Sequence, residues 1–97
     1  MLFVVLGRAK DSSDPIDRNT RRVDWQYPEG VTVIGEYWLE HGNPRLVSIL
    51  ETDSVVAMFA ATSQWEDHFD FTIVPAVTAE QGIEMTRARM EAMAAIT

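Results

Sequence analysis

The side chains that could carry chemistry gather in the middle of the chain, over Val31–Asp53. Glu36 and Glu51 lie in two β-rich segments on either side of a turn at Gly42-Asn43. Trp38 lies two residues after Glu36, so in a strand the two side chains point to the same face. A carboxyl group buried beside an apolar ring has a raised pKa and can act as a general acid or base. The other interpretation, which the sequence favours, is that both carboxylates are solvated or paired with arginines across a dimer interface.

A second group of polar residues surrounds His68, which has Glu66, Asp67 and Asp70 as neighbours. These residue types suit a divalent metal, but a metal site needs three converging ligands and groups that orient them. The spacing matches no known metal pattern, so we interpret His68 as a histidine at a helix end beside acidic residues. His41 lies in the turn and is expected to be exposed. We therefore predict no metal and no cofactor.

Nucleophilic chemistry has little support in this sequence. Ser48 and Ser54 have no histidine at a recognisable spacing, and there is no G-x-S-x-G motif. The glycines form no phosphate-binding loop, and the chain contains no cysteine for a thiolate or a disulfide. No residue can be assigned as catalytic from the sequence.

The charge balance argues against nucleic acid and anionic membranes as partners. The 97 residues include 15 Asp and Glu but 8 Lys and Arg, a net charge of −7. The densest group of arginines, within Asp14–Asp24, is interleaved with aspartates, whereas phosphate binding needs clustered cations. The apolar start is too short for a signal peptide, and no apolar run approaches the ~20 residues that span a bilayer. We expect one cytoplasmic domain, residues 1–97.

Hydrophobic patterning and helix caps predict the elements that hold these residues. Asp14 before Pro15, Asp53 or Ser54, and a capping box at Thr78 mark the helix starts. The expected strands are Met1–Arg8, Val31–Glu40, Arg45–Glu51 and Phe69–Val77, and the expected helices are Pro15–Tyr27, Ser54–Asp67 and Thr78–Ile96. The order predicts an α+β, ferredoxin-like β-α-β-β-α-β fold with an added C-terminal helix. Its first and third strands should be central, and its second and fourth should be edges.

The turn at Gly42-Asn43 decides which residues of the two middle strands share a face. A loop of two or four residues pairs Glu40 with Arg45 and Glu36 with Ile49, whereas a three-residue loop would mix the faces. With the even loop, an uncharged face carries Val33, Gly35, Tyr37, Leu39, Leu46, Ser48 and Leu50 under the helices. The opposite face is predicted to contact a partner or ligand, through Glu36, Trp38, Ile49 and Glu51 with Asp70 and Thr72 of the last strand.

Several segments also resemble a known family. They are MLFVVL at the start, GEYW, RLVSILETD, Trp65-Glu66-Asp67 and FDFTIVPA. With them, the chain resembles the domain of unknown function 3303 family, in the dimeric α/β-barrel superfamily. The resemblance implies a homodimer in which two ferredoxin-like units pack their sheets face to face, with a chamber either between each sheet and its helices or across the two sheets. Superfamily members include cofactor-free monooxygenases, muconolactone-type isomerases and haem-handling enzymes, but no segment here matches their active residues.

Two functional hypotheses follow. The first is a homodimeric interaction module or binder of a small organic molecule. The alternative is a cofactor-free enzyme, monooxygenase-like or isomerase-like, on a small aromatic or unsaturated substrate, with Glu36 or Glu51 as the base. A strongly raised pKa of Glu36 in an enclosed pocket against Trp38 would favour the enzyme.

Overall fold

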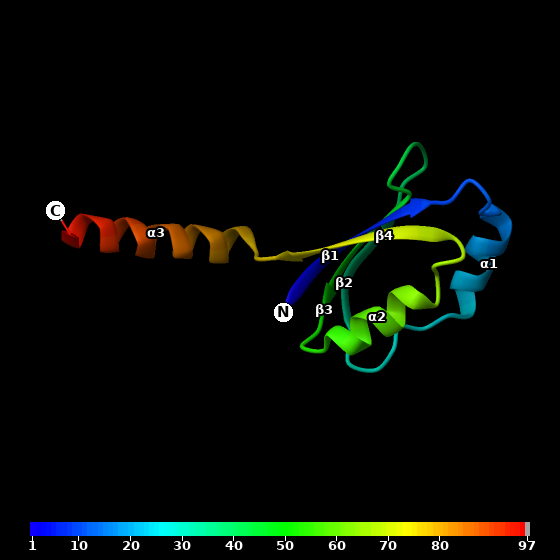
Figure 1. Ribbon diagram of the computed structural model, residues 1–97, viewed down its shortest axis with the longest axis horizontal. Helices are drawn as coiled ribbons and strands as arrows, with labels where there is room; N and C mark the ends of the chain where they lie inside the picture. The colour runs from blue at the N-terminus through cyan, green and yellow to red at the C-terminus, as the bar shows by residue number, and fades with distance from the viewer. Residues whose placement is uncertain (97) are drawn as a thin grey trace.

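The computed structural model describes residues 1–96, which form one four-stranded antiparallel sheet and three helices. In chain order the elements are β1 (Leu2–Ala9), α1 (Pro15–Asp24), β2 (Thr32–Trp38), β3 (Leu46–Glu51), α2 (Val55–Ser63), β4 (Phe69–Ala76) and α3 (Ala79–Ile96) (Figure 1). The strand order in the sheet is β2-β3-β1-β4. The predicted α+β, ferredoxin-like fold with a C-terminal helix is confirmed, with β1 and β3 in the centre.

The central strand β1 lies between β3 and β4, and its alternate residues Phe3, Val5 and Gly7 are buried on the face that the helices cover. It pairs with β3 and β4, and its residues Phe3 and Val5 form the buried core with Leu50 of β3 and Met58 of α2. Pro75, which cannot donate to a ladder, lies in the edge strand β4, as its position in the sequence predicts.

Each helix begins at the cap that the sequence predicts. The Asp14 carboxylate accepts a hydrogen bond from the Ile16 amide at 3.0 Å, before Pro15 at the first helical position. The Ser54 hydroxyl accepts from the Ala57 amide at 3.1 Å. Thr78 and Gln81 form the reciprocal bonds of a capping box, at 3.1 and 2.9 Å. These local bonds satisfy backbone groups that the first helical turn leaves free.

The first helix ends earlier than predicted. Trp25 has an extended backbone, with φ −79° and ψ 138°, so α1 stops at Asp24 and does not reach Tyr27. The Trp25 carbonyl accepts a hydrogen bond from the Arg22 side chain at 2.9 Å, and the Trp25 and Tyr27 rings pack edge to face at 4.7 Å. This tertiary packing outweighs the helical spacing that the sequence suggested for Tyr27.

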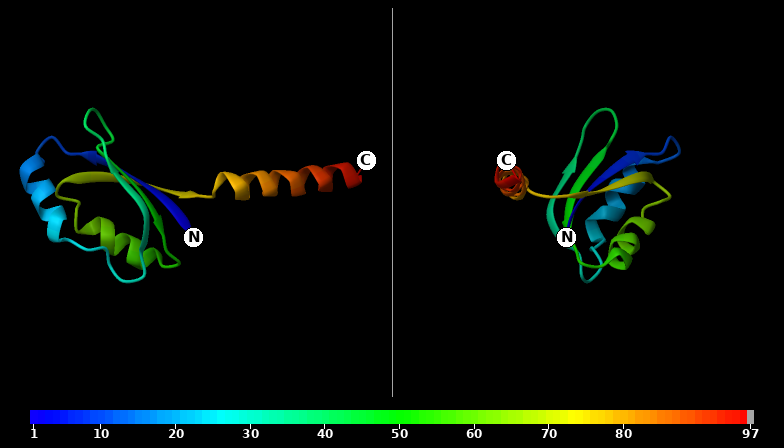
Figure 2. Two further views of the ribbon diagram at one scale, coloured as in Figure 1. Left: turned by 180° about the vertical axis from the view of Figure 1, so that it is seen from behind. Right: turned by 60° about the vertical axis from the view of Figure 1, so that its left-hand side comes forward.

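Both α1 and α2 cover the same face of the sheet (Figure 2). The opposite face, which we call the outer face, carries two cross-strand rows. One row is Gly35, Ile49, Val4 and Val74, and the other is Tyr37, Val47, Leu6 and Thr72. No described helix covers this face, and Tyr37 and Val74 are 58% and 44% exposed.

The predicted hairpin register is wrong. Trp38 lies opposite Leu46 and Glu36 opposite Ser48, and the Leu39 amide donates to the Arg45 carbonyl at 2.8 Å. The connection over residues 40–44 therefore has an odd length, and the shift of one residue turns over the part of β2 from Gly35 to Trp38. A register irregularity between Val33 and Gly35 leaves Val33 opposite Leu50, on the face predicted for it.

As a result, Glu36 and Trp38 face the helices, and Tyr37 faces outward. Tertiary contacts hold this loop: the Arg45 side chain donates to the Leu39 and Glu40 carbonyl oxygens, and the Ala9 amide donates to the Asn43 side chain at 3.3 Å. The predicted charge pair between Arg45 and the Glu40 carboxylate is replaced by this contact with the Glu40 backbone.

The last helix, α3, projects from the end of β4 away from the sheet and the other helices (Figure 1). None of its described residues is buried, and the long axis of the molecule reaches 60 Å. Its large apolar residues Ile83, Met90, Met93 and Ile96 are all exposed. Within residues 1–96, no helix combines the length and apolarity needed to cross a bilayer.

Gly7 permits a close approach inside the sheet, which yields a stability prediction. A Cβ atom at Gly7 would lie 3.1 Å from both Leu46 Cβ and Phe69 Cδ1. Gly7→Ala should therefore lower the free energy of unfolding by about 1–3 kcal/mol through overpacking, as measured by urea denaturation. Gly82→Ala is the matched control, because its Cβ meets no atom closer than 4.0 Å on the exposed helix α3. Equal stability of Gly7→Ala and the wild type would contradict this packing.

Candidate functional site

A cavity of about 350 Å³ lies between the sheet and the helices α1 and α2. Its walls are largely aromatic, formed by Trp25, Tyr27, Trp38, Trp65, Phe69 and Phe71. All three tryptophans of the chain are among them. The apolar rings come from the α1–β2 connection, β2, the segment after α2, and β4, so the cavity exists only in the folded chain.

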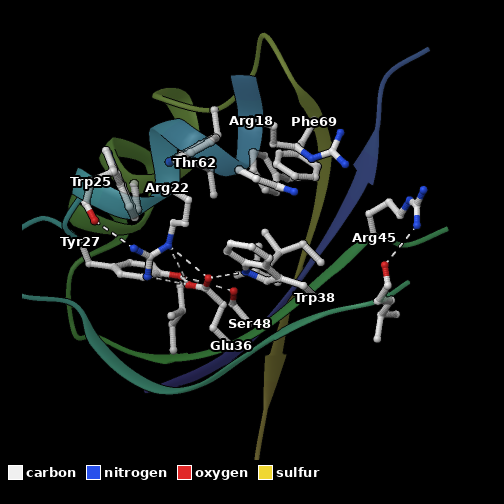
Figure 3. Close-up of a pocket in the computed structure, with 18 of the residues that line it drawn as sticks. Arg18, Arg22, Trp25, Tyr27, Glu36, Trp38, Arg45, Ser48, Thr62 and Phe69 are labelled. Atoms are coloured by element: carbon white, nitrogen blue, oxygen red, sulfur yellow. Dashed lines mark hydrogen bonds and ion pairs between the residues drawn. The ribbon is translucent and has the colours of Figure 1, made fainter. Parts of the chain in front are cut away.

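The polar centre of the cavity is the carboxylate of Glu36, which accepts hydrogen bonds from three side chains (Figure 3). Arg22 donates from Nη2 to Oε1 at 3.0 Å and from Nε to Oε2 at 3.1 Å. The Tyr27 hydroxyl donates to Oε1 at 2.6 Å, and Trp38 Nε1 donates to Oε2 at 2.7 Å. We call Glu36 and these three donors the Glu36 cluster. The Glu36 side chain is 14% exposed.

Local structure explains how these donors converge. Glu36 and Trp38 are alternate residues of β2 and so share one face, which brings the indole N–H back to the carboxylate. Arg22 extends from the last turn of α1, and Tyr27 follows from the extended connection. Ser48, opposite Glu36 on β3, lies 3.3 Å from the Tyr27 hydroxyl.

The cluster keeps Glu36 ionised. Burial alone would raise the pKa of Glu36, but the hydrogen bonds from Arg22, Tyr27 and Trp38, with the charge of Arg22, outweigh burial and hold its pKa below the ordinary value. Burial and the hydrogen bond to Glu36 raise the pKa of Tyr27 to about 12. A carboxylate with a lowered pKa and occupied oxygens is a weak base, which does not match the raised pKa expected of a catalytic Glu36.

Two further arginines, Arg18 of α1 and Arg45 before β3, lie together at another end of the cavity (Figure 3). Arg18 donates from Nη1 to Ser13 Oγ at 2.8 Å, and its guanidinium lies 5.5 Å from the centre of the Phe69 ring. Burial, followed by the charge of Arg45, lowers the pKa of Arg18, and Asp14 opposes the shift. Within residues 1–96, neither Arg18 nor Arg45 forms an ion pair with a carboxylate.

The structure separates the residues that the sequence grouped into one surface. Glu36 and Trp38 line the cavity. Ile49, Glu51 and Thr72 lie instead on the outer face, because their register partners on β1 are Val4, Leu2 and Leu6. Asp70 also faces outward, 3.8 Å from the Lys10 ammonium group. The predicted common surface is therefore wrong, because it depended on the even hairpin loop.

The sequence reasoning missed Arg22, Tyr27 and Ser48. Arg22 had been counted as neutralised by neighbouring aspartates, although its carboxylate partner is Glu36, 14 residues away. The predicted helix over Pro15–Tyr27 includes Tyr27, which lies outside α1 in the structure. With a connection of odd length, Glu36 and Ser48 lie opposite each other. A prediction of the odd register would therefore have placed these two residues together.

His68 holds two segments together. It is 5% exposed, its Nδ1 lies 2.7 Å from Ser13 Oγ, and its Nε2 lies 2.7 Å from Asp17 Oδ2. These residue types resemble a catalytic triad, but Ser13 Oγ also accepts from Arg18 and does not line the cavity. We therefore assign the group to the attachment of α1 to the start of β4. Within residues 1–96, no three metal-ligating side chains converge.

Comparison with known proteins identifies the family of the chain. The model of a family described as Domain of unknown function (DUF3303) matches residues 1–90. The chain belongs to this family. No curated protein and no solved structure matches the chain. We therefore infer the function of this DUF3303 protein from the geometry of its cavity.

The Glu36 cluster yields a prediction about stability. Glu36→Gln leaves the Arg22 guanidinium without its carboxylate, so the free energy of unfolding at pH 7 should fall by about 1–3 kcal/mol in urea denaturation. Because the pKa of Glu36 is lowered on folding, its stabilisation is present above the ordinary value of 4.5 and is lost as pH falls through the folded pKa. The difference between Glu36→Gln and wild type should therefore shrink in acid.

The control for this prediction is Glu29→Gln, a change at an exposed residue of the α1–β2 connection. Its effect on the free energy of unfolding should stay within about 0.5 kcal/mol. A similar small effect of Glu36→Gln would contradict the assignment of the cluster as a structural anchor.

Proposed function

We propose that this protein is a homodimeric binding module for a small organic ligand with an aromatic body. The observation that carries the proposal is the cavity of about 350 Å³, whose walls combine six aromatic rings with two groups of charged side chains, Glu36 with Arg22 and Arg18 with Arg45. Ligand sites are typically concave, mostly apolar and largely preformed, with a small number of placed polar groups that set orientation. The cavity has these properties.

The Glu36 cluster supports binding because it keeps the cavity rigid. Trp38, a wall residue that is 53% exposed, is held by its indole bond to Glu36 at 2.7 Å. Tyr27 is held by the same carboxylate and lies against Trp25. A wall whose rings are already oriented loses less side-chain entropy when a ligand binds.

The alternative, a cofactor-free enzyme with Glu36 or Glu51 as base, lacks this support. The pKa of Glu36 is lowered, and Arg22, Tyr27 and Trp38 occupy its oxygens. Glu51 lies on the outer face, away from the cavity.

Two exposed apolar surfaces support a second copy of the chain as the partner. The outer face carries Val4, Leu6, Val47 and Ile49 in its centre, with no described helix against it. Helix α3 has no buried residue, whereas most of the stability of helices in proteins comes from tertiary packing of one face. A dimer that packs the outer faces together would remove this apolar surface from water, which is favourable at roughly 25 cal/mol per Å².

Ligand binding can be tested by tryptophan fluorescence, because all three tryptophans line the cavity. We expect at least one of the matched probes 2-naphthoate and 2-naphthamide to change the emission saturably, with a Kd below about 1 mM. Ala61→Phe should weaken this binding at least about tenfold, because the buried Ala61 lines the cavity and the larger ring would fill it.

Ser63→Phe is the matched control for the filled cavity. Ser63 is exposed on the same helix and does not line the cavity, so the probe should bind this variant as it binds the wild type. A complete absence of saturable binding of both probes to the wild type would overturn the proposed function.

The dimer can be tested by light scattering, which should give twice the chain mass of 11.0 kDa. Ile49→Lys puts a charge into the centre of the outer face and should yield a monomer. Val56→Lys adds the same charge to α2, at a residue that is 79% exposed, and should leave the dimer intact. A wild-type monomer, or an Ile49→Lys dimer, would contradict the outer-face interface.

A further inference from the structure

We propose that the ligand of this cavity is an anion, with an aromatic body between the rings and an oxyanion group, carboxylate or phosphate, held by Arg18 and Arg45. This inference rests on the proposed binding function and names the chemical class of the ligand. It comes from a contrast among the arginines around the cavity and from the opposite charges at its two ends.

The arginines near the cavity divide into two pairs. Arg21 is paired with Asp67 at 2.6 Å, and Arg22 with Glu36 at 3.0 Å. Arg18 and Arg45 have no carboxylate partner among residues 1–96 and lie at the same end of the cavity. An incoming anion would therefore have no ion-pair partner to displace from Arg18 or Arg45.

Most hydrogen-bond donors of these two arginines remain available. A guanidinium group has five N–H donors. Arg18 uses one for Ser13 Oγ, and Arg45 uses Nη1 for the carbonyl oxygens of Leu39 and Glu40. Both side chains are half-buried, so a bound oxyanion would be partly shielded from water, where charge-assisted hydrogen bonds are strong.

The positions of the two charges also favour an anion. Arg18 and Arg45 repel each other, and an oxyanion between them would remove that repulsion. Asp14 acts on Arg18 from outside the cavity lining, and the exposed Glu40 is the other carboxylate at this end. Neither is within ion-pair distance of Arg18 or Arg45 in the described residues.

The aromatic walls and the Glu36 cluster determine the orientation of the ligand. The ionised Glu36 carboxylate would repel a second carboxylate, so the oxyanion group belongs at the arginine end. The body of the ligand would then lie between Phe69, which Arg18 already covers at 5.5 Å, and the Trp38 ring. Aromatic rings favour such stacked or edge contacts with a planar ligand.

The test compares 2-naphthoate with 2-naphthamide, which has the same ring system and nearly the same size but no charge. Fluorescence titration at pH 7 and low salt should give a Kd for 2-naphthoate at least about tenfold lower than for 2-naphthamide. A parallel titration with 2-naphthyl phosphate distinguishes the two oxyanions, and the tighter of the two identifies the preferred group. Added salt should weaken the binding of the anions and leave that of the amide unchanged.

Substitutions locate the anion. Arg18→Gln and Arg45→Gln should each reduce the preference for 2-naphthoate at least about threefold, and should leave the Kd of 2-naphthamide unchanged. Retained amide binding also shows that each variant is folded. Arg8→Gln, at an exposed arginine on the outer side of β1, should leave the preference as in the wild type.

The outcomes separate this inference from the proposed function. If 2-naphthamide binds as tightly as both anions, the cavity binds aromatic molecules but the anion inference is overturned. If neither probe binds, the proposed function itself fails. The comparison of the two probes on the wild type decides the inference even where a variant does not fold.

Discussion

The cavity depends on one buried carboxylate. Glu36 lies between the sheet and the helices, where burial by itself would favour the neutral acid, yet bonds from Arg22, Tyr27 and Trp38 keep it ionised. A buried charge is tolerated when its lone pairs are satisfied and a counter-charge is close. Because the Glu36 carboxylate needs these hydrogen bonds, they fix the end of α1, the extended path through Tyr27 and the direction of the Trp38 ring. The same carboxylate therefore anchors two walls of the cavity.

The two faces of the sheet have different roles because the helices cover one of them. The covered face holds the core, the aromatic cavity and the arginines at its end. The outer face and α3 together carry the apolar surface that the fold leaves uncovered. This division connects the two proposals: a ligand between sheet and helices, and a second copy of the chain against the opposite side. The cavity and the outer face have no residue in common.

Local signals predicted much of the fold. The caps at Asp14, Ser54 and Thr78 depend on hydrogen bonds that span two or three residues, so they can be recognised in the sequence. Pro75 indicated an edge strand for a similar reason, because a missing N–H excludes a central position. The candidate site was predicted in part. Glu36 and Trp38 line the cavity as the main polar and aromatic pair, but the expected partners Ile49 and Glu51 lie on the other face.

By itself, the sequence determined the order of the elements and the edges and centre of the sheet, because these follow from residue type, period and local hydrogen bonds. The resemblance of several segments to a known family also indicated the family. Only the tertiary structure decided which way β2 faces. A strand alternates with a period of two, so one residue in the loop over 40–44 exchanges the faces of β2 from Gly35 to Trp38. The Arg45 contacts with that loop and the bonds from Arg22 and Tyr27 to Glu36 select the observed register. The bonds from Arg22 and Tyr27 join residues 14 and 9 positions apart in different elements, so no local pattern of the sequence predicts them.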